Sequence, residues 1–108
     1  MAQFINRIEL CGVVGRSNSE KVGERTVVRF SLNTTSTGNG AFIETCWHDV
    51  VYWTTPTDRA ALEIGRGDCI HVWGRIRYYS YINREGNEVK AYQCLAERLA
   101  VESKATGE

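Results

Sequence analysis

The chain has 108 residues, enough for one domain with one hydrophobic core, and its 43% hydrophobic and 24% charged residues are ordinary for a globular protein. Basic and acidic residues balance at 13 each, so the net charge of zero gives no sign of a polyanionic partner. No apolar run approaches the roughly 18 residues that a membrane span needs, and no signal peptide is recognisable, so we expect a cytoplasmic protein.

Alternation of apolar and polar residues predicts two β-strands in the first third of the chain, over residues 4–14 and 26–34. Gly12 within the first strand predicts a bend or bulge of the kind that barrel strands need. Arg29 and Ser31 fall on the outer face of the second strand. The apolar side chains expected on the inner faces are Phe4, Ile8, Leu10, Val14, Val28, Phe30 and Leu32.

A third strand is predicted over residues 43–53, after a glycine-rich loop tip at 36–40. Its even positions Cys46, Val50 and Tyr52 are expected in the core. The odd positions share the opposite face, and they are Trp47, Asp49, Val51 and Trp53.

A short helix of about two to three turns is predicted after the third strand. Thr55 can serve as its N-cap, and Pro56 suits the first helical position. Asp58 would lie near the positive end of the helix dipole, and Gly65 would end the helix.

Residues 69–82 and 89–101 are predicted to form the last two strands, joined by a hairpin loop that contains Gly86. The resulting order is β-β-β-α-β-β, with one short helix between the third and fourth strands. This order is typical of the OB-fold, a five-stranded Greek-key barrel of the all-β class, and a two-sheet sandwich is the main alternative. The domain is expected to span residues 1–103, followed by a short, frayed tail at 104–108.

The four cysteines, Cys11, Cys46, Cys69 and Cys94, lie far apart, without the paired spacing of a zinc site. We expect reduced thiols that act as small core residues, with no metal and no cofactor. Cys46 and His48 share a strand face, but no catalytic motif accompanies them. The protein is therefore not expected to be an enzyme.

The fourth strand interleaves aromatic and basic side chains. Between Arg66 and Arg84 there are four arginines and one acid, Asp68, so a basic stripe is hidden in the neutral total. Alternation places Ile70, Val72, Gly74, Ile76 and Tyr78 inward, and His71, Trp73, Arg75, Arg77, Tyr79 and Tyr81 outward. Outward rings beside cations favour single-stranded nucleic acid, because rings stack on unpaired bases and cations neutralise phosphates. The pattern alone is also compatible with a subunit interface, and His71 and Trp73 fit an interface better than a nucleic-acid contact.

Five segments in order, IELCGVVG, VVRFSLNTT, ETCWHDVVYW, GRGDCIHVWGRIR and EGNEVKAYQC, resemble the bacterial single-stranded DNA-binding proteins (SSB) from about residue 4 to residue 101. The resemblance implies that Trp47, Trp53 and Tyr81 stack on DNA and that Arg77 contacts it. It also implies that His48 lies at a tetramer interface.

We therefore expect two sets of functional residues. Those expected to bind single-stranded DNA are Arg29, Ser31, Trp47, Trp53, Arg75, Arg77, Tyr79, Tyr81, Arg84 and Lys90. Those expected at a subunit interface are His48, His71 and Trp73. The resemblance implies sequence-independent binding and protection of single-stranded DNA in replication, recombination and repair, by a cytoplasmic, nucleoid-associated homotetramer or else a dimer. RNA remains an open alternative to DNA.

The chain departs from the family pattern in three places. Asp49 stands where the family commonly has a basic residue, and the loop at 36–41 is short and lacks a tryptophan often found there. The acidic tip that recruits replication and repair proteins in the family is absent before Glu108. We expect either a shortened tail or a tailless relative, such as a PriB-like primosomal OB protein that acts mainly as an adaptor between proteins and single-stranded DNA.

Overall fold

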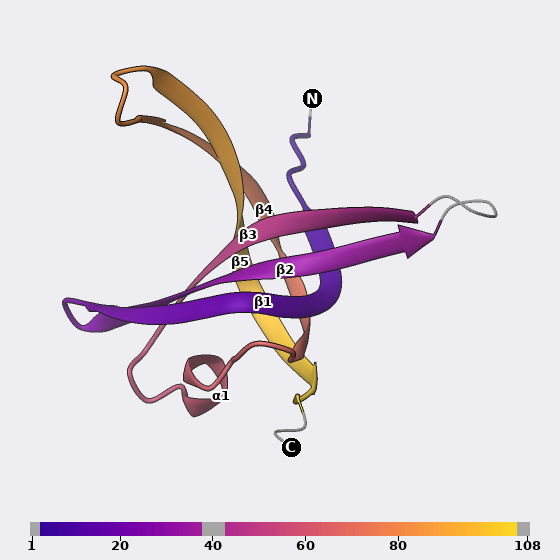
Figure 1. Cartoon of the computed structure of the whole chain (residues 1–108). Coiled ribbons are helices and arrows are strands. Elements are labelled where there is room, and N and C mark those ends of the chain that lie inside the picture. The colour runs from indigo at the N-terminus through magenta and orange to yellow at the C-terminus, as the bar shows by residue number, and fades with distance from the viewer. Residues whose placement is uncertain (1–2, 38–42, 106–108) are drawn as a thin grey trace.

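Five β-strands and one short helix are formed within residues 3–37 and 43–105, the part of the chain that this computed structural model describes (Figure 1). The elements are β1 (Ile8–Val22), β2 (Arg25–Thr37), β3 (Ile43–Thr54), α1 (Arg59–Leu62), β4 (Cys69–Ile82) and β5 (Glu88–Ser103). The strands close into one barrel in the order β1-β2-β3-β5-β4, with β3 and β5 parallel and the other neighbours antiparallel. This confirms the expected all-β OB-fold with its helix between the third and fourth strands.

Alternation predicted most of the barrel interior correctly. The buried side chains include Val14, Val28, Phe30, Leu32, Val50, Ile70 and Val72, joined by Cys94 and Ala96 of β5. Ile8, Leu10 and Tyr52 pack against this cluster while staying partly exposed. Ala61 and Ile64 cover the cluster from α1 and the turn after it, so the short helix closes the barrel on one side.

Three residues expected inside the barrel are exposed. Phe4 is 94% exposed because it precedes β1, and Tyr78 is 77% exposed. Cys46 is exposed opposite Thr34. The β2–β3 and β4–β5 hairpins both extend beyond the barrel (Figure 1), so Cys46 and Tyr78 keep the predicted face of their strands but have no core behind them. We call residues 77–93 the β4–β5 arm.

The helix is shorter than expected and begins later. Asp58, not Thr55, is the N-cap, and its carboxylate accepts hydrogen bonds from the Ala61 amide at 3.2 Å and the Thr54 hydroxyl at 2.6 Å. A single turn follows before the chain leaves the helix at Glu63. Asp is as good an N-cap as any residue, and the Thr54 hydroxyl orients this carboxylate, which explains the later start. No helix in the described residues has the length and apolar character that crossing a membrane requires.

The cysteines do not all join the core. The four thiols are free, but Cys94 is buried, Cys69 is half-buried, and Cys11 and Cys46 are exposed. Burial and the nearby Glu97 carboxylate raise the pKa of Cys94 to about 11, so this thiol is unreactive. The expectation of core thiols is correct for Cys94 and wrong for the two exposed thiols: Cys11 lies on the outer face of β1, and Cys46 lies where β3 extends beyond the barrel.

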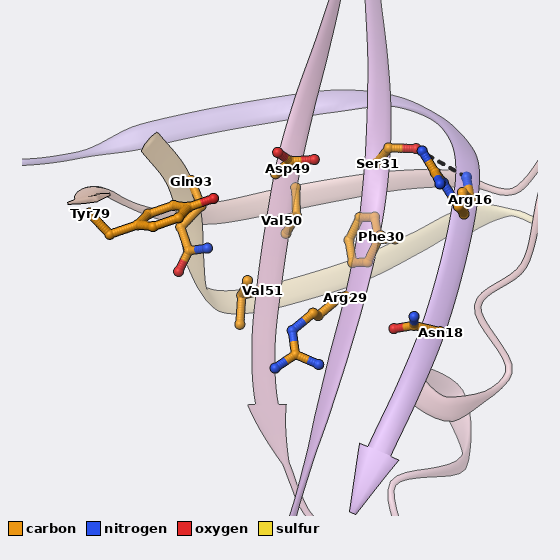
Figure 2. Close-up of a pocket in the computed structure, with 10 residues that line it drawn as sticks. All are labelled: Arg16, Asn18, Arg29, Phe30, Ser31, Asp49, Val50, Val51, Tyr79 and Gln93. Atoms are coloured by element: carbon orange, nitrogen blue, oxygen red, sulfur yellow. Dashed lines mark hydrogen bonds between the residues drawn. The ribbon is translucent and has the colours of Figure 1, made fainter. Parts of the chain in front are cut away.

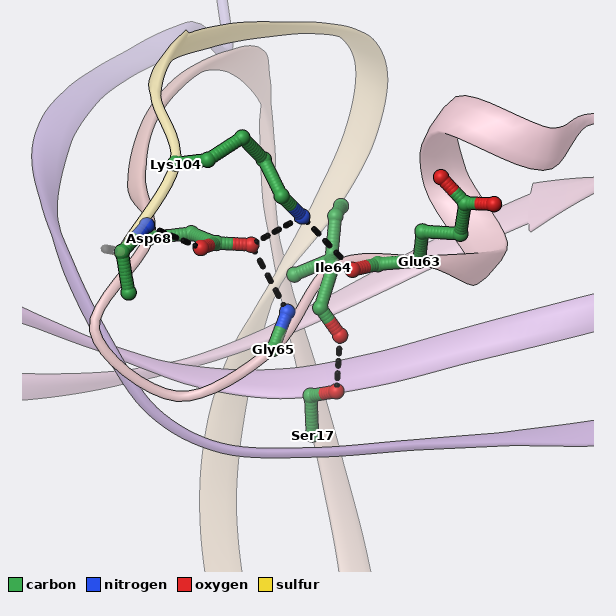
Figure 3. A network of polar contacts seen from close by, with 7 residues as sticks. Ser17, Glu63, Ile64, Gly65, Asp68 and Lys104 are labelled. Atoms are coloured by element: carbon green, nitrogen blue, oxygen red, sulfur yellow. Dashed lines mark hydrogen bonds and ion pairs between the residues drawn. The ribbon is translucent and has the colours of Figure 1, made fainter. Parts of the chain in front are cut away.

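A buried carboxylate fastens the end of β5 to the turn before β4 (Figure 3). Asp68 is 3% exposed and accepts hydrogen bonds from the Gly65 amide at 2.9 Å, the Ala105 amide at 2.8 Å and the Lys104 ammonium at 2.6 Å. Lys104 also donates to the carbonyl of Glu63 at 2.7 Å. Lys104 and Ala105, expected in a frayed tail, are thus held to the domain.

We expect Asp68→Asn to lower the free energy of unfolding by about 2 kcal/mol at neutral pH, since hydrogen bonds to a buried charge are lost. Burial alone would raise the pKa of Asp68, but the hydrogen bonds from Ala105, Lys104 and Gly65 outweigh it and hold the pKa below 3.8. A lowered folded pKa stabilises the protein above the unfolded pKa, and this contribution is lost as pH falls through the folded value.

Urea unfolding at pH 7 and at stepped values below pH 4 measures this effect. The gap between wild type and Asp68→Asn should be constant near neutrality and shrink in acid. Lys104→Met, which removes one donor and leaves the two amide hydrogen bonds, should show a smaller loss. A gap that is unchanged down to pH 2 would show that the charge of Asp68 contributes nothing.

Candidate nucleic-acid interface

Trp47 lies on the outer face of β3, and its exposed ring packs on one side against the protein. Its indole packs against Gly15, where an added Cβ would approach the ring to 2.5 Å. The side chain is still 56% exposed. Beside it, the Ser31 hydroxyl accepts a hydrogen bond from the Arg16 amide at 3.0 Å. One face of the indole therefore rests on the protein and the rest is open to a planar partner.

An open groove of about 370 Å³ runs beside this ring and joins β1, β2 and β3 to the arm (Figure 2). It brings together three residues of the predicted DNA-binding set, Arg29, Ser31 and Tyr79. A neighbouring groove holds Trp47 and shares Arg16, Ser31 and Asp49 with the first. Four of the predicted residues, from β2, β3 and β4, thus converge on one side of the barrel: Arg29, Ser31, Trp47 and Tyr79.

The cations on this side differ in their partners. Arg29 forms an ion pair with Glu20 at 3.0 Å, with both side chains well exposed, so the pair contributes little and can open. Arg16 and Arg66 line the Trp47 groove, and the prediction from sequence missed both. Arg16 was missed because β1 continues to Val22 through a polar stretch that carries no apolar alternation.

Trp53 and Arg75 meet in a separate groove farther along β3. The Arg25 guanidinium lies 5.6 Å from the centroid of the Trp53 ring, within the range of a cation–π contact. Arg25 was not among the expected residues, although it stands at the start of β2. This groove pairs a large ring with two cations, but Glu97 also lines it.

The arm carries the remaining expected residues on two faces. Tyr79 and Tyr81 lie on one face with ring centroids 6.2 Å apart, and alternation adds Arg77 to that face. Lys90 pairs with Ser80 and so lies on the opposite face. That second face also carries Tyr78 and Tyr92, with ring centroids 6.3 Å apart, and Arg84 is exposed in the turn at the tip of the arm.

Two of the three expected interface residues form one stack. His71 and Trp73 lie parallel on the outer face of β4, with ring centroids 3.9 Å apart. The Arg98 guanidinium covers the Trp73 ring at 4.1 Å, and Glu9 contacts the His71 imidazole at 2.6 Å. His71 and Trp73 are both half-buried in this stack, on the face that they would present to a second subunit.

His48 lies elsewhere, on β3. Its Nε2 atom shares a hydrogen bond with the Thr34 hydroxyl at 2.9 Å. Its Nδ1 atom is buried and has no hydrogen-bond partner within the described residues. A buried polar atom without a partner is uncommon in folded proteins.

Comparison with known proteins supports the fold described above. The structure is similar to a chain described as "Plasmodium falciparum SSB complex with ssDNA", with a TM-score of 0.79 over 97% of this chain and 99% of that chain. The two sequences are 18% identical, so this likeness concerns the fold. No curated protein matches the sequence. The model of the "Single-strand binding protein family" matches residues 5–102, nearly the whole described chain, and the protein therefore belongs to that family.

Proposed function

We propose that this protein binds single-stranded DNA along the side of the barrel that carries Trp47, the two shared grooves and the Tyr79–Tyr81 face of the arm. One observation carries the proposal: the exposed ring of Trp47 on β3 and the half-buried ring of Tyr79 on β4 border grooves lined by arginines from β1 and β2. Membership of the single-strand binding family supports it, as does the fold shared with a protein solved in complex with single-stranded DNA. The family acts by binding and not by catalysis.

The chemistry of this surface favours unpaired strands. A ring can stack on a base only where the base is not already stacked in a duplex, and each such contact contributes about 1–3 kcal/mol. Stacking accepts every base, so binding requires no defined target sequence. Arg16, Arg29 and Arg77 supply cations for phosphates, although the net charge of the chain is zero.

The proposal extends to the protection of single-stranded DNA during replication, recombination and repair, by a cytoplasmic homotetramer. Family membership supports this role. The stack on the outer face of β4 combines two aromatic rings with an arginine, side chains of the kinds enriched at subunit interfaces: His71, Trp73 and Arg98. Light scattering of the purified protein measures the assembly directly.

Intrinsic tryptophan fluorescence tests the central claim. Addition of oligo-dT is expected to quench the emission strongly, because Trp47 is exposed and stacks on bases. The affinity should fall as salt rises, since each neutralised phosphate releases a counterion. A duplex of equal length should quench far less. Unchanged emission with oligo-dT at low salt would contradict the proposal and favour the alternative of an OB adaptor whose rings contact a protein.

A further inference from the structure

The second face of the β4–β5 arm consists of exposed side chains. In order from the barrel to the tip, they are paired across the two strands as Tyr78 with Tyr92, Ser80 with Lys90, and Ile82 with Glu88. Tyr78 is 77% exposed and Ile82 is 67% exposed, with no core behind them. Large apolar side chains that gather on an uncovered face are typical of a binding surface.

The arm is a two-stranded ribbon whose edges are unpaired. Within residues 3–37 and 43–105, the ladder of β1 on β4 reaches only to Gly74, and the ladder of β3 on β5 begins only at Cys94. Residues 77–93 therefore extend away from the barrel as a thin ribbon (Figure 1). A DNA strand on the Tyr79–Tyr81 face can pass around an edge of this ribbon and reach the second face, because no further strand is paired there.

Rings and a cation lie together on the second face. The ring centroids of Tyr78 and Tyr92 are 6.3 Å apart and the ring planes are inclined at 49°, so the two rings do not cover each other. Lys90 lies on the same face, two residues along β5 from Tyr92. The carboxylate of this face belongs to Glu88, which lies beyond Lys90 toward the tip and is farther from the rings. Rings stack on unpaired bases and an ammonium group neutralises a phosphate, so the rings and Lys90 suit single-stranded nucleic acid.

The first face of the same ribbon favours DNA as the occupant of the second. Tyr79 and Tyr81, with ring centroids 6.2 Å apart, belong to the proposed DNA-binding side. A strand bound to them brings its next nucleotides to the edge of the ribbon. Binding to the second face then continues one strand that is already held, which costs less than a separate encounter with a protein partner.

We propose that single-stranded DNA continues around the arm and stacks on Tyr78 and Tyr92, with Lys90 against its backbone, so that both faces of the arm bind bases. This inference rests on the proposed binding of single-stranded DNA and adds a second contact surface to it. The added surface lengthens the stretch of DNA that each chain covers. It brings no base preference, because stacking accepts every base.

The experiment compares a long oligo-dT with the shortest oligo-dT that fully quenches the tryptophan emission, for the wild type and a variant with both Tyr78→Val and Tyr92→Val. Valine removes the rings but preserves the strand propensity of the ribbon. For the long oligonucleotide, the dissociation constant is expected to rise at least about fivefold, the lower end for one stacked base. The number of nucleotides bound per chain at saturation should fall. For the short oligonucleotide, the dissociation constant and the quenching should match the wild type.

The variant with both Tyr78→Phe and Tyr92→Phe is the matched control, since it retains the rings, and it should bind the long oligo-dT as the wild type does. The wrapped arm is overturned, while single-stranded DNA binding stands, if the valine variant binds the long oligonucleotide with wild-type affinity. An equal loss for both oligonucleotides overturns it too, because the tyrosine pair would then only hold the ribbon together. So does a change in assembly without DNA, measured by light scattering, which would assign this face to a second copy of the chain. If the wild type binds neither oligonucleotide, the proposed function itself fails.

Discussion

Replacing both Trp47 and Tyr81 by alanine is expected to weaken oligo-dT binding by about 2–6 kcal/mol, with each single change accounting for about 1–3 kcal/mol. The two rings stand on different strands, β3 and β4, and are exposed on the same proposed side of the molecule. Since they would stack on different bases, their contributions should be close to additive. Such a loss would abolish binding at the protein concentrations where the wild type is saturated.

Anisotropy of a labelled oligo-dT measures this loss without relying on the emission of the tryptophan that is removed. Trp47→Phe and Tyr81→Phe retain a ring and should bind much more tightly than the alanine variants. Because Trp47 packs on Gly15, circular dichroism and light scattering must show intact folding and assembly. Full binding by a folded, assembled double variant would mean that these rings contact a protein and not DNA.

The barrel could be predicted from the sequence because inner strand positions alternate with outer ones. Val28, Phe30 and Leu32 are buried at the expected period of two, and Ile70 and Val72 follow the same rule on β4. The order of the elements, five strands with one short helix between the third and fourth, then indicated the OB-fold over a two-sheet sandwich. Local pattern identified most of the core positions, but it did not identify Val27, which is fully buried on the opposite face of β2.

The same pattern failed where strands leave the barrel. Alternation assigns a residue to a face, but burial depends on whether another strand or the helix passes behind that face. Tyr78 lies on the inner face of β4, but no other element passes behind it, so it is exposed. Val51 lies on the outer face of β3, but it is buried where β3 pairs with Leu95 of β5. The extension of β1, which carries Arg16 into the grooves, was missed for a related reason: its exposed residues are polar on both faces.

Lys90 shows how register limits the prediction of a site. A basic residue near the end of a hairpin can lie on either face, and the face is decided by its partner across the ladder. Lys90 pairs with Ser80, so it points away from Tyr79 and Tyr81. To contact Lys90, the DNA would have to reach the second face of the arm. That face also carries Tyr92, which was not among the predicted residues.

Gly74→Ala is expected to lower the free energy of unfolding by about 3 kcal/mol, at the upper end of the usual cost of overpacking. Gly74 sits at the bulge where β4 crosses β5, opposite Ala96. A Cβ there would lie 2.2 Å from the carbonyl oxygen of Leu95 and 2.9 Å from the Cα of Ala96. Both are backbone atoms of the adjacent strand, so no side-chain rotation relieves the overlap. The strand must shift, and the shift is transmitted to the buried Cys94.

Gly86→Ala is the matched control in the same hairpin, and it separates overlap from backbone strain. Gly86 has φ of +84° in the turn of the arm, and no atom lies within 4 Å of an added Cβ. The change therefore costs only the strain of a left-handed residue, about 1–2 kcal/mol. Urea unfolding of both variants should show the larger loss for Gly74→Ala. A larger loss of stability for Gly86→Ala than for Gly74→Ala would contradict the close approach of β4 and β5 at Gly74. Backbone strain at Gly86 would then cost more than the overlap at Gly74.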